Sequence, residues 1–256
     1  MKIALCFSGQ PRQVSEGYNV SIYKNLIEPN NITDVFVHTW FRREWKNGTP
    51  YQTVNRPIWN FNKSMIEDIE KLYNPLKMEV EDDTDYHDFI NENYINNENY
   101  ISDEKRVILY SYPRFLSIYK SNKLKNEYEK EHGFEYDVII KARFDLYIRD
   151  IIINIKDLDM SKFHIPVYAS RPFIEDETFP TSDWGVNDQF AIGNKKNMDI
   201  YADLVNNISK IAEARHDTSC EGTTGTYLLI NNVPIHKSWH SAYTSKDWKI
   251  GFLLNR

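Results

Sequence analysis

Short apolar runs alternate with amphipathic stretches along this chain. The apolar runs at 2–7, 34–40 and 137–140 predict strands, and the β-branched residues 138–140 are typical of a strand buried on both faces. At 15–28 and 107–130, apolar side chains recur with helical spacing. Because strand, helix and strand follow one another at the start, the pattern predicts an α/β fold with a mainly parallel, twisted sheet flanked by helices.

The rest of the chain has a weaker pattern. We expect further strands near 77–80, 151–155, 163–167 and 188–193, and further helices at 64–73, 195–214 and 222–231. Residues 41–105 are rich in Asn, Asp, Glu and Tyr, which indicates a variable, partly irregular insertion. No internal repeat or clear linker is present, so we expect residues 1–256 to form a single domain.

Composition and charge exclude several classes of protein. The chain has 256 residues and a net charge of −6, which argues against a dedicated nucleic-acid binder because such proteins usually carry a basic surface. Its two cysteines, Cys6 and Cys220, cannot build a disulfide framework, which favours a reducing compartment. No signal-peptide pattern or transmembrane run is visible, so we expect a cytoplasmic protein.

The most informative stretch is 136–150, which reads YDVIIKARFDLYIRD. Its apolar run leads directly into Lys141, Arg143 and Asp145, although unpaired charge is costly to bury. In open α/β sheets, ligands bind outside the carboxyl ends of the strands. Asp145 therefore either meets a ligand or forms a salt bridge that caps the sheet.

Three segments together resemble GT-A-type nucleotide-sugar glycosyltransferases, and most closely the small enzymes of bacterial, phage and large-virus glycan clusters. They are IALCFSGQPR with the following DVFVHTW, then YDVIIKARFDLYI, then NDQFAIGNKKNMDIY. The resemblance covers most of the chain and implies a GT-A-like, Rossmann-like domain. It also implies transfer of a sugar from a nucleotide-sugar donor to a hydroxyl of a glycan acceptor. The alternatives are a nucleotidyltransferase, or a non-catalytic glycan- or nucleotide-binding protein of the same fold.

The resemblance implies a divalent cation, Mn²⁺ or Mg²⁺, that holds the donor diphosphate. The family usually places an Asp-X-Asp motif at this strand end, whereas this chain reads Arg143-Phe144-Asp145. Asp145 is the matching metal ligand, and His236 corresponds to a late histidine that some of these enzymes use as well. Alternatively, Arg143 contacts the diphosphate directly, because a guanidinium binds phosphate oxygens in pairs.

The resemblance also places the donor nucleotide at the turn after the first strand. Gly9 lets the backbone approach a ligand closely, and Arg12 supplies positive charge. The residues assigned to the nucleotide-sugar site are Ser8, Gly9, Gln10, Arg12, His38, Arg143, Trp184, Gln189 and Lys237. An ordinary strand-to-helix turn and a hydrogen-bonded core histidine at His38 are the structural alternatives.

Two acids are candidates for the catalytic base. Asp188 precedes an apolar strand in NDQFAIG, where related enzymes have an acid near the transferred sugar. Glu221 precedes a helix behind the same site. An inverting transferase needs such a carboxylate within hydrogen-bond reach of the acceptor hydroxyl. The alternatives are a turn-capping role for Asp188 and a favourable helix-dipole position for Glu221.

Overall fold

The computed structural model of the protein describes most of the chain. The described residues are 1–11, 14, 19–41, 63–82, 102–148, 152–168, 186, 189–208, 211, 220–243 and 250–254. Only the backbone is described at 41, 63, 102–110, 167–168, 237–243 and 250–254.

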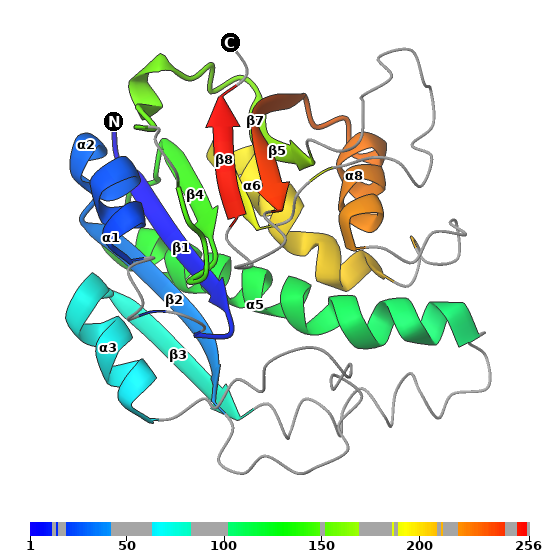
Figure 1. Ribbon diagram of the computed structural model, residues 1–256, viewed down its shortest axis with the longest axis horizontal. Coiled ribbons are helices and arrows are strands. Elements are labelled where there is room, and N and C mark those ends of the chain that lie inside the picture. Colours follow the sequence, from blue (N-terminus) through cyan, green and yellow to red (C-terminus); the bar gives the residue numbers. More distant parts are fainter. Residues whose placement is uncertain are drawn as a thin grey trace.

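Within this part of the chain, eight strands form one mixed sheet (Figure 1) in the order β3-β2-β1-β4-β6-β5-β7-β8. The strands are β1 (Ile3–Gly9), β2 (Asp34–Phe41), β3 (Lys77–Asp82), β4 (Val138–Ala142), β5 (Phe163–Tyr168), β6 (Phe190–Gly193), β7 (Ile235–Tyr243) and β8 (Ile250–Leu254). Strands β1, β2, β3, β4, β5 and β7 share one direction, and β6 and β8 run the opposite way. The prediction of an α/β fold with a mainly parallel sheet is confirmed.

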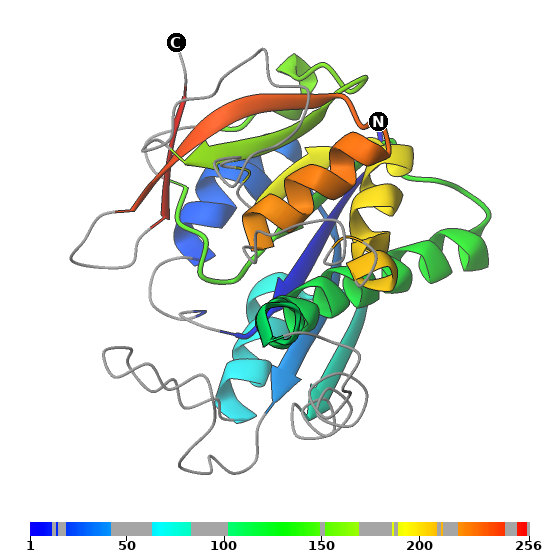
Figure 2. The same cartoon turned by 90° about the vertical axis from the view of Figure 1, so that its right-hand side faces the viewer.

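Helices cover both faces of the sheet (Figures 1 and 2). One face carries α1 (Asn19–Ile22), the π-helical turn η2 (Tyr23–Ile27), α2 (Glu28–Asn30) and α3 (Lys63–Tyr73). The other carries α5 (Ser102–His132), α6 (Lys195–Ala202) with the 3₁₀ segment η5 (Asp203–Asn207), and α8 (Cys220–Ile230). Helices α6 and α8 pack against each other and against α5. The result is a three-layer arrangement with a core on each side of the sheet.

Alternation along the strands explains the two cores. In β1, Leu5 and Phe7 belong to the core under α1 and α3, whereas Ala4 and Cys6 face α5. Successive strand residues point to opposite faces, so a strand covered on both sides must be apolar throughout. The continuous run in β4 has the same cause, since all its residues from Val138 to Ala142 are buried.

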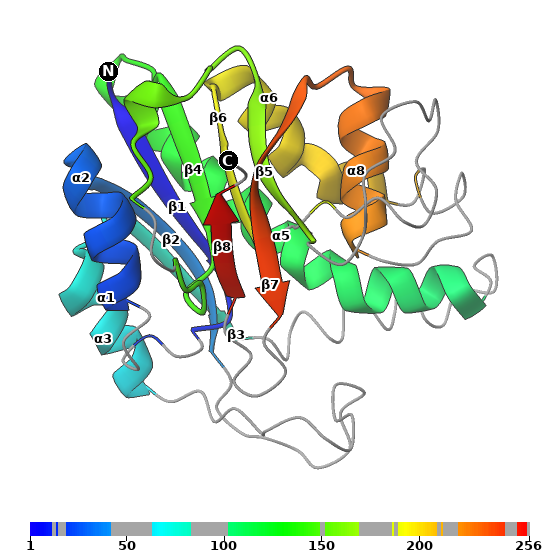
Figure 3. The ribbon, with the colours of Figure 1, turned by 45° about the horizontal axis from the view of Figure 1, so that its top comes forward.

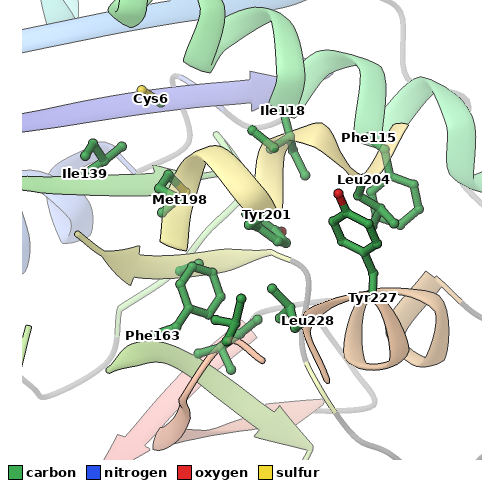
Figure 4. Close-up of a cluster of buried hydrophobic side chains, with 14 of the residues drawn as sticks. Cys6, Phe115, Ile118, Ile139, Phe163, Met198, Tyr201, Leu204, Tyr227 and Leu228 are labelled. Atoms are coloured by element: carbon green, nitrogen blue, oxygen red, sulfur yellow. The ribbon is translucent and has the colours of Figure 1, made fainter. Parts of the chain in front are cut away.

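The core beneath α5 joins three helices to the middle of the sheet (Figure 4). Its labelled members are Cys6, Phe115, Ile118, Ile139, Phe163, Met198, Tyr201, Leu204, Tyr227 and Leu228. Close packing requires a glycine at position 193, because a Cβ there would lie 2.8 Å from Cδ2 of Phe163. This core therefore fixes where α5 and α8 lie against the strands that carry the candidate site.

Three sequence-based expectations about elements were wrong. Residues 151–155 form no strand in the described segment 152–155; there Asn154 caps the 3₁₀ helix η4 (Ile155–Asp157) by accepting a hydrogen bond from the Lys156 N–H. The helix expected at 195–214 is α-helical only to Ala202 and continues as a 3₁₀ segment. The first strand reaches Gly9 rather than ending at residue 7.

Helix α5 is the main support of one face of the sheet. It has 31 residues, contains Pro113, and contacts both β1 and β2. No helix in the described ranges, α5 included, is both long and apolar enough to span a membrane. The buried polar side chains of α5 face the sheet and α6.

Candidate functional site

The centre of the sheet has the topology at which α/β proteins bind ligands. The chain proceeds from β1 to β2 on one side, while β4 pairs with β1 on the other (Figure 3). Ligands in open α/β sheets bind outside the carboxyl ends of the strands where the order reverses in this way. The candidate site therefore lies where β1 ends at Gly9 and β4 ends at Ala142.

Strand pairing brings several predicted residues to this edge. Ala142 pairs with Phe190 of the antiparallel β6. Arg143 and Gln189 are the next residues beyond this pair, so both lie at the carboxyl edge of β4. Gln189 is buried there, with 6% of its surface exposed. The predicted grouping of the β1 turn, the 143–145 segment and Gln189 along one edge agrees with this placement.

Arg143 and Asp145 form a two-point ion pair beyond β4. The Arg143 Nε donates to Oδ1 of Asp145 at 2.8 Å, and Nη2 donates to Oδ2 at 2.5 Å. Both side chains are largely buried, with 18% and 13% of their surface exposed. The salt-bridged strand end that the sequence left open is therefore present, and both carboxylate oxygens of Asp145 accept from a permanently charged guanidinium.

The turn after β1 is held by two side chains. Gly9 has φ of +102°, a conformation that side chains other than glycine rarely adopt. Its N–H donates to Oγ of Ser117 on α5 at 2.6 Å, and its carbonyl accepts from the Thr39 hydroxyl at 2.9 Å. Ser8 and Thr39 are almost completely buried. Predicted donor-site residues Ser8, Gly9 and Gln10 thus lie at the edge beside β4.

His38 is a hydrogen-bonded core histidine at the same edge. It has no exposed surface, and its ring lies edge-on to Trp40. Its Nδ1 lies 2.8 Å from Oγ of Ser117, and its Nε2 lies 2.8 Å from Oε2 of Glu81. Burial lowers the pKa of His38, against the opposing effect of Glu81, so the ring is neutral at physiological pH. This arrangement separates His38 from solvent and links it to α5.

Beside His38, two acids of β3 surround a lysine of α5. Lys120 Nζ lies 3.2 Å from Glu79 and also forms a short ion pair with Glu81. The hydrogen bond from His38, helped by Lys120, lowers the pKa of Glu81 to about 2 although burial opposes this. Ligand atoms of His38, Glu79 and Glu81 lie within 4.8 Å of one another, so the three can hold a metal ion. In this structure the Lys120 ammonium supplies the positive charge at that point.

Ser117, His38 and Glu81 have the connectivity of a nucleophile, a base and an orienting acid. A nucleophile must reach its substrate, whereas Ser117 has no exposed surface and its oxygen already accepts the Gly9 N–H. We therefore do not assign hydrolase chemistry to this chain of residues. Its geometry is that of a support for the β1 turn.

Sequence analysis missed the partners of His38. Glu79 and Glu81 alternate along a strand, a signal that places both on one face. That pattern could have indicated a paired acidic site beside His38. No local signal identifies Ser117, because its contacts with Gly9 and His38 span 108 and 79 residues.

Glu221 lies at the same end of the molecule as the candidate site. It belongs to the first turn of α8, and the preceding Cys220 places Sγ 2.9 Å from Oγ of Ser111 on α5. Ser111 precedes Ser117 by six residues, or about 9 Å along a helix. The beginning of α8 therefore lies against the part of α5 that leads to Ser117.

His236 occupies a different part of the sheet. It pairs with His164, which is level with Ile192 and hence with Ile140 in the middle of β4. Two strands separate β7 from β4, which corresponds to about 14 Å across the sheet. The structure therefore does not bring His236 to Asp145 as the two ligands of one metal ion.

The remaining predicted residues cannot be placed by side chain. Lys237 lies in β7, where only its backbone is described. Arg12, Trp184 and Asp188 fall outside the described residues, so their assignments stay predictions.

Similarity to known proteins assigns no role to these residues. The chain matches no protein-family model. It matches no curated protein either.

Proposed function

We propose that the protein is a glycosyltransferase that transfers a sugar from a nucleotide-sugar donor to a glycan hydroxyl. The observation that carries the proposal is the juxtaposition at the sheet's reversal point. The Ser8–Gln10 turn ends β1, and the Arg143–Asp145 pair follows the neighbouring β4. This is the edge where the sequence resemblance puts the nucleotide and the diphosphate, and where α/β sheets bind ligands in general.

In the proposed reaction, the acceptor oxygen bonds to the sugar's anomeric carbon and the bond from that carbon to the diphosphate breaks. The acceptor proton passes to a carboxylate, either Asp188 or Glu221. The departing nucleoside diphosphate gains negative charge, which Arg143 is placed to stabilise if it exchanges Asp145 for phosphate oxygens. Most of the rate acceleration then comes from positioning and charge stabilisation.

The divalent cation implied by the resemblance does not fit the Arg143–Asp145 pair as it stands. Both oxygens of Asp145 already accept from Arg143, so a cation there would have to displace the guanidinium. At the His38, Glu79 and Glu81 group it would have to displace Lys120. Mn²⁺ or Mg²⁺ at Asp145 stays a prediction, and no step above depends on it.

A panel of UDP-, GDP-, dTDP- and CMP-sugars tests the function. Thermal unfolding with and without Mn²⁺ should show a higher melting temperature for the matching donor, because ligands that bind the native state stabilise it. The purified protein should then release nucleotide slowly from that donor, with water in place of the acceptor. Asp188→Asn should lower this release by about 10²–10⁴-fold if Asp188 is the base.

Matched variants separate the two candidate acids and the rival function. Glu221→Gln should lower release instead if Glu221 is the base, whereas Glu70→Gln on α3 serves as the surface control. The rival is a non-catalytic binding protein, favoured by the engagement of both Asp145 oxygens with Arg143. A donor that raises the melting temperature but is never hydrolysed, nor transferred to any glycan tested, would support the rival.

A further inference from the structure

We infer that Ser117 and Thr39 are positioning residues that hold the turn after β1 in its ligand-binding shape. Neither residue was singled out from the sequence, and neither belongs to the proposed catalytic machinery. The inference about the turn stands on geometry alone. The identity of the ligand, the diphosphate of a nucleotide-sugar, rests on the proposed function.

Both polar groups of the Gly9 residue are bound by side chains, at the point where its pairing with β2 ends. Ser117 accepts its N–H from α5, and Thr39 donates to its carbonyl from β2. Ser117 and Thr39 have no exposed surface, so water does not compete for either bond. The last residue of β1 is thereby fixed to a helix on one face and to the neighbouring strand. Its left-handed conformation then sets the direction in which Gln10 leaves the sheet.

A second tier fixes the direction of the Ser117 hydroxyl. The Glu81 carboxylate can only accept, so Nε2 of His38 carries the hydrogen in their 2.8 Å bond. In a neutral ring, Nδ1 is then an acceptor, so the Ser117 hydrogen is directed to His38, which offers two acceptors: Nδ1 at 2.8 Å and the backbone carbonyl at 3.2 Å. The lone pairs of Ser117 remain for the Gly9 N–H. Lys120 holds Glu81 in place from α5.

Other buried serines of α5 provide the comparison that makes Ser117 distinctive. Ser121, one turn further along, donates only to the Ile118 carbonyl of its own helix. Ser111 contacts Cys220 of α8. Burying polar groups has a desolvation cost, so a buried network that ends at a ligand-binding turn is best explained by preorganisation of that turn.

Amide hydrogen exchange of the unliganded protein, followed by NMR, tests the support of the turn. Ser117→Ala should speed exchange of the Gly9 amide about ten-fold because its buried acceptor is lost. Ser117→Thr keeps the hydroxyl and should restore slow exchange, whereas Ser121→Ala should leave the Gly9 rate unchanged. Equal Gly9 rates in the unaltered protein and in Ser117→Ala would overturn the inference.

Thr39→Val supplies a second variant if Ser117→Ala fails to fold, because it removes a hydroxyl at nearly constant shape. It should loosen the Gly9–Gln10 peptide, measured as faster exchange of the Gln10 amide, because it frees the Gly9 carbonyl. Unchanged exchange at both amides would contradict the inference.

Calorimetry with UDP, GDP, dTDP and CMP, the nucleotides of the donor panel, tests the ligand. Ser117→Ala should weaken the affinity for the nucleotide that binds about ten-fold more than Ser121→Ala does. The affinity of Ser117→Thr should lie between the two. If none of the nucleotides binds the unaltered protein, the proposed function fails while the exchange result still decides the positioning role. If a nucleotide binds and Ser117→Ala binds it equally well, the ligand assignment is overturned.

Discussion

Two polar networks along α5 hold different parts of the molecule. The first joins Ser117 and Lys120 to His38 and the acids of β3, and it ends at the backbone of Gly9. The second begins one turn later at Asn122 and connects α5 to α6. Both bury ionisable groups under the same sheet, yet they differ in what lies at their ends.

The second network consists of ion pairs within α5 and α6 and ion pairs between these two helices. Lys125 has no exposed surface, and its Nζ lies 3.2 Å from Glu129 and 3.7 Å from Asp199. Lys195 of α6 adds bonds to the same two acids at 2.9 and 3.2 Å. Glu129 also accepts the backbone N–H of Tyr136 before β4. This network therefore joins α5 to α6 and to the segment that leads into β4.

The first network ends at the last residue of β1, where the chain leaves the sheet. Its terminal groups are the N–H of Gly9 and, through Lys120, the partly exposed acids Glu79 and Glu81. Buried charge by itself therefore does not mark a ligand-binding site in this protein. The location of the network at a carboxyl edge distinguishes the one that supports a candidate ligand site.

Removing an acid from the second network should have the largest effect on stability. Glu129→Ala leaves Lys125 buried without its closest partner and also removes the acceptor of the Tyr136 N–H. We expect a loss of about 3–5 kcal/mol in the free energy of unfolding, measured with urea. Glu127→Ala, which breaks exposed pairs, should cost less than about 1 kcal/mol. Similar losses in both variants would erase the difference between buried and exposed pairs.

Substitutions in the Arg143–Asp145 pair should change nucleotide affinity in opposite directions. Arg143→Gln removes the guanidinium and should weaken binding of the matching nucleoside diphosphate about 10–100-fold. Asp145→Asn removes the carboxylate charge that competes with phosphate for the guanidinium, and should strengthen binding without metal several-fold. Calorimetry with and without Mn²⁺ measures both. If Asp145→Asn instead abolishes a binding enthalpy that requires Mn²⁺, Asp145 is the metal ligand and Arg143 is its neighbour.

The sequence predicted the strands of the candidate site because their local signal was strong. β1, β2 and β4 are buried on both faces, so their apolar runs are continuous, and the polar residues that end them are conspicuous. The edge position of Ser8, Arg143 and Asp145 followed from this pattern together with the parallel sheet. The sequence allowed Asp145 either to meet a ligand or to form a salt bridge, and the pairing with Arg143 depends on side-chain geometry that the pattern does not contain.

The rest depended on contacts that local pattern does not encode. Ser117 looks like any polar residue on an amphipathic helix, and its role comes from a fold that brings residues 9, 38 and 117 together. The strands β7 and β8 were missed because their residues, as in IHKSWHSAY, do not form an apolar run. The break after Ala202 was missed because the apolar spacing continues through η5, although the backbone tightens there.

Two glycines test whether the ligand site is sensitive to the turn itself or to stability in general. Gly9→Ala places a side chain at φ of +102° with no neighbouring atom within 4 Å, so its cost is conformational, about 1–2 kcal/mol. Gly193→Ala forces a Cβ against Phe163 and should cost about 1–3 kcal/mol through overpacking. Urea unfolding measures both costs.

The two glycine variants should differ in binding. Gly9→Ala should also weaken nucleotide binding, whereas Gly193→Ala, located at the far end of β6, should leave affinity unchanged. Equal losses of affinity at equal loss of stability would show that binding follows general stability and not the shape of the turn.

The smallest expected effect is on the acid sensitivity of the first network. Glu81 has a folded-state pKa of about 2 against an ordinary value of 4.5, mainly because His38 donates a hydrogen bond to it. As the pH falls below 4.5, the unfolded chain protonates Glu81 before the folded protein does, so the free energy of unfolding decreases between about pH 4.5 and 2. Since Glu81 is partly exposed, solvent screening reduces this contribution to about 1 kcal/mol.

Glu81→Gln keeps an acceptor for His38 but cannot titrate, so its stability should fall less steeply with acid below pH 4.5. The lowered pKa of His38, which burial causes, acts in the same direction at higher pH, because the unfolded histidine protonates first below its ordinary value of 6.5. That slope should persist in the variant. Urea titrations from pH 7 to pH 3 give both slopes, with Glu70→Gln on α3 as the control. If the free energy of unfolding falls equally steeply below pH 4.5 in the unaltered protein and in Glu81→Gln, the His38–Glu81 bond does not hold this edge of the sheet. The first network would then lose the feature that distinguishes it from the second.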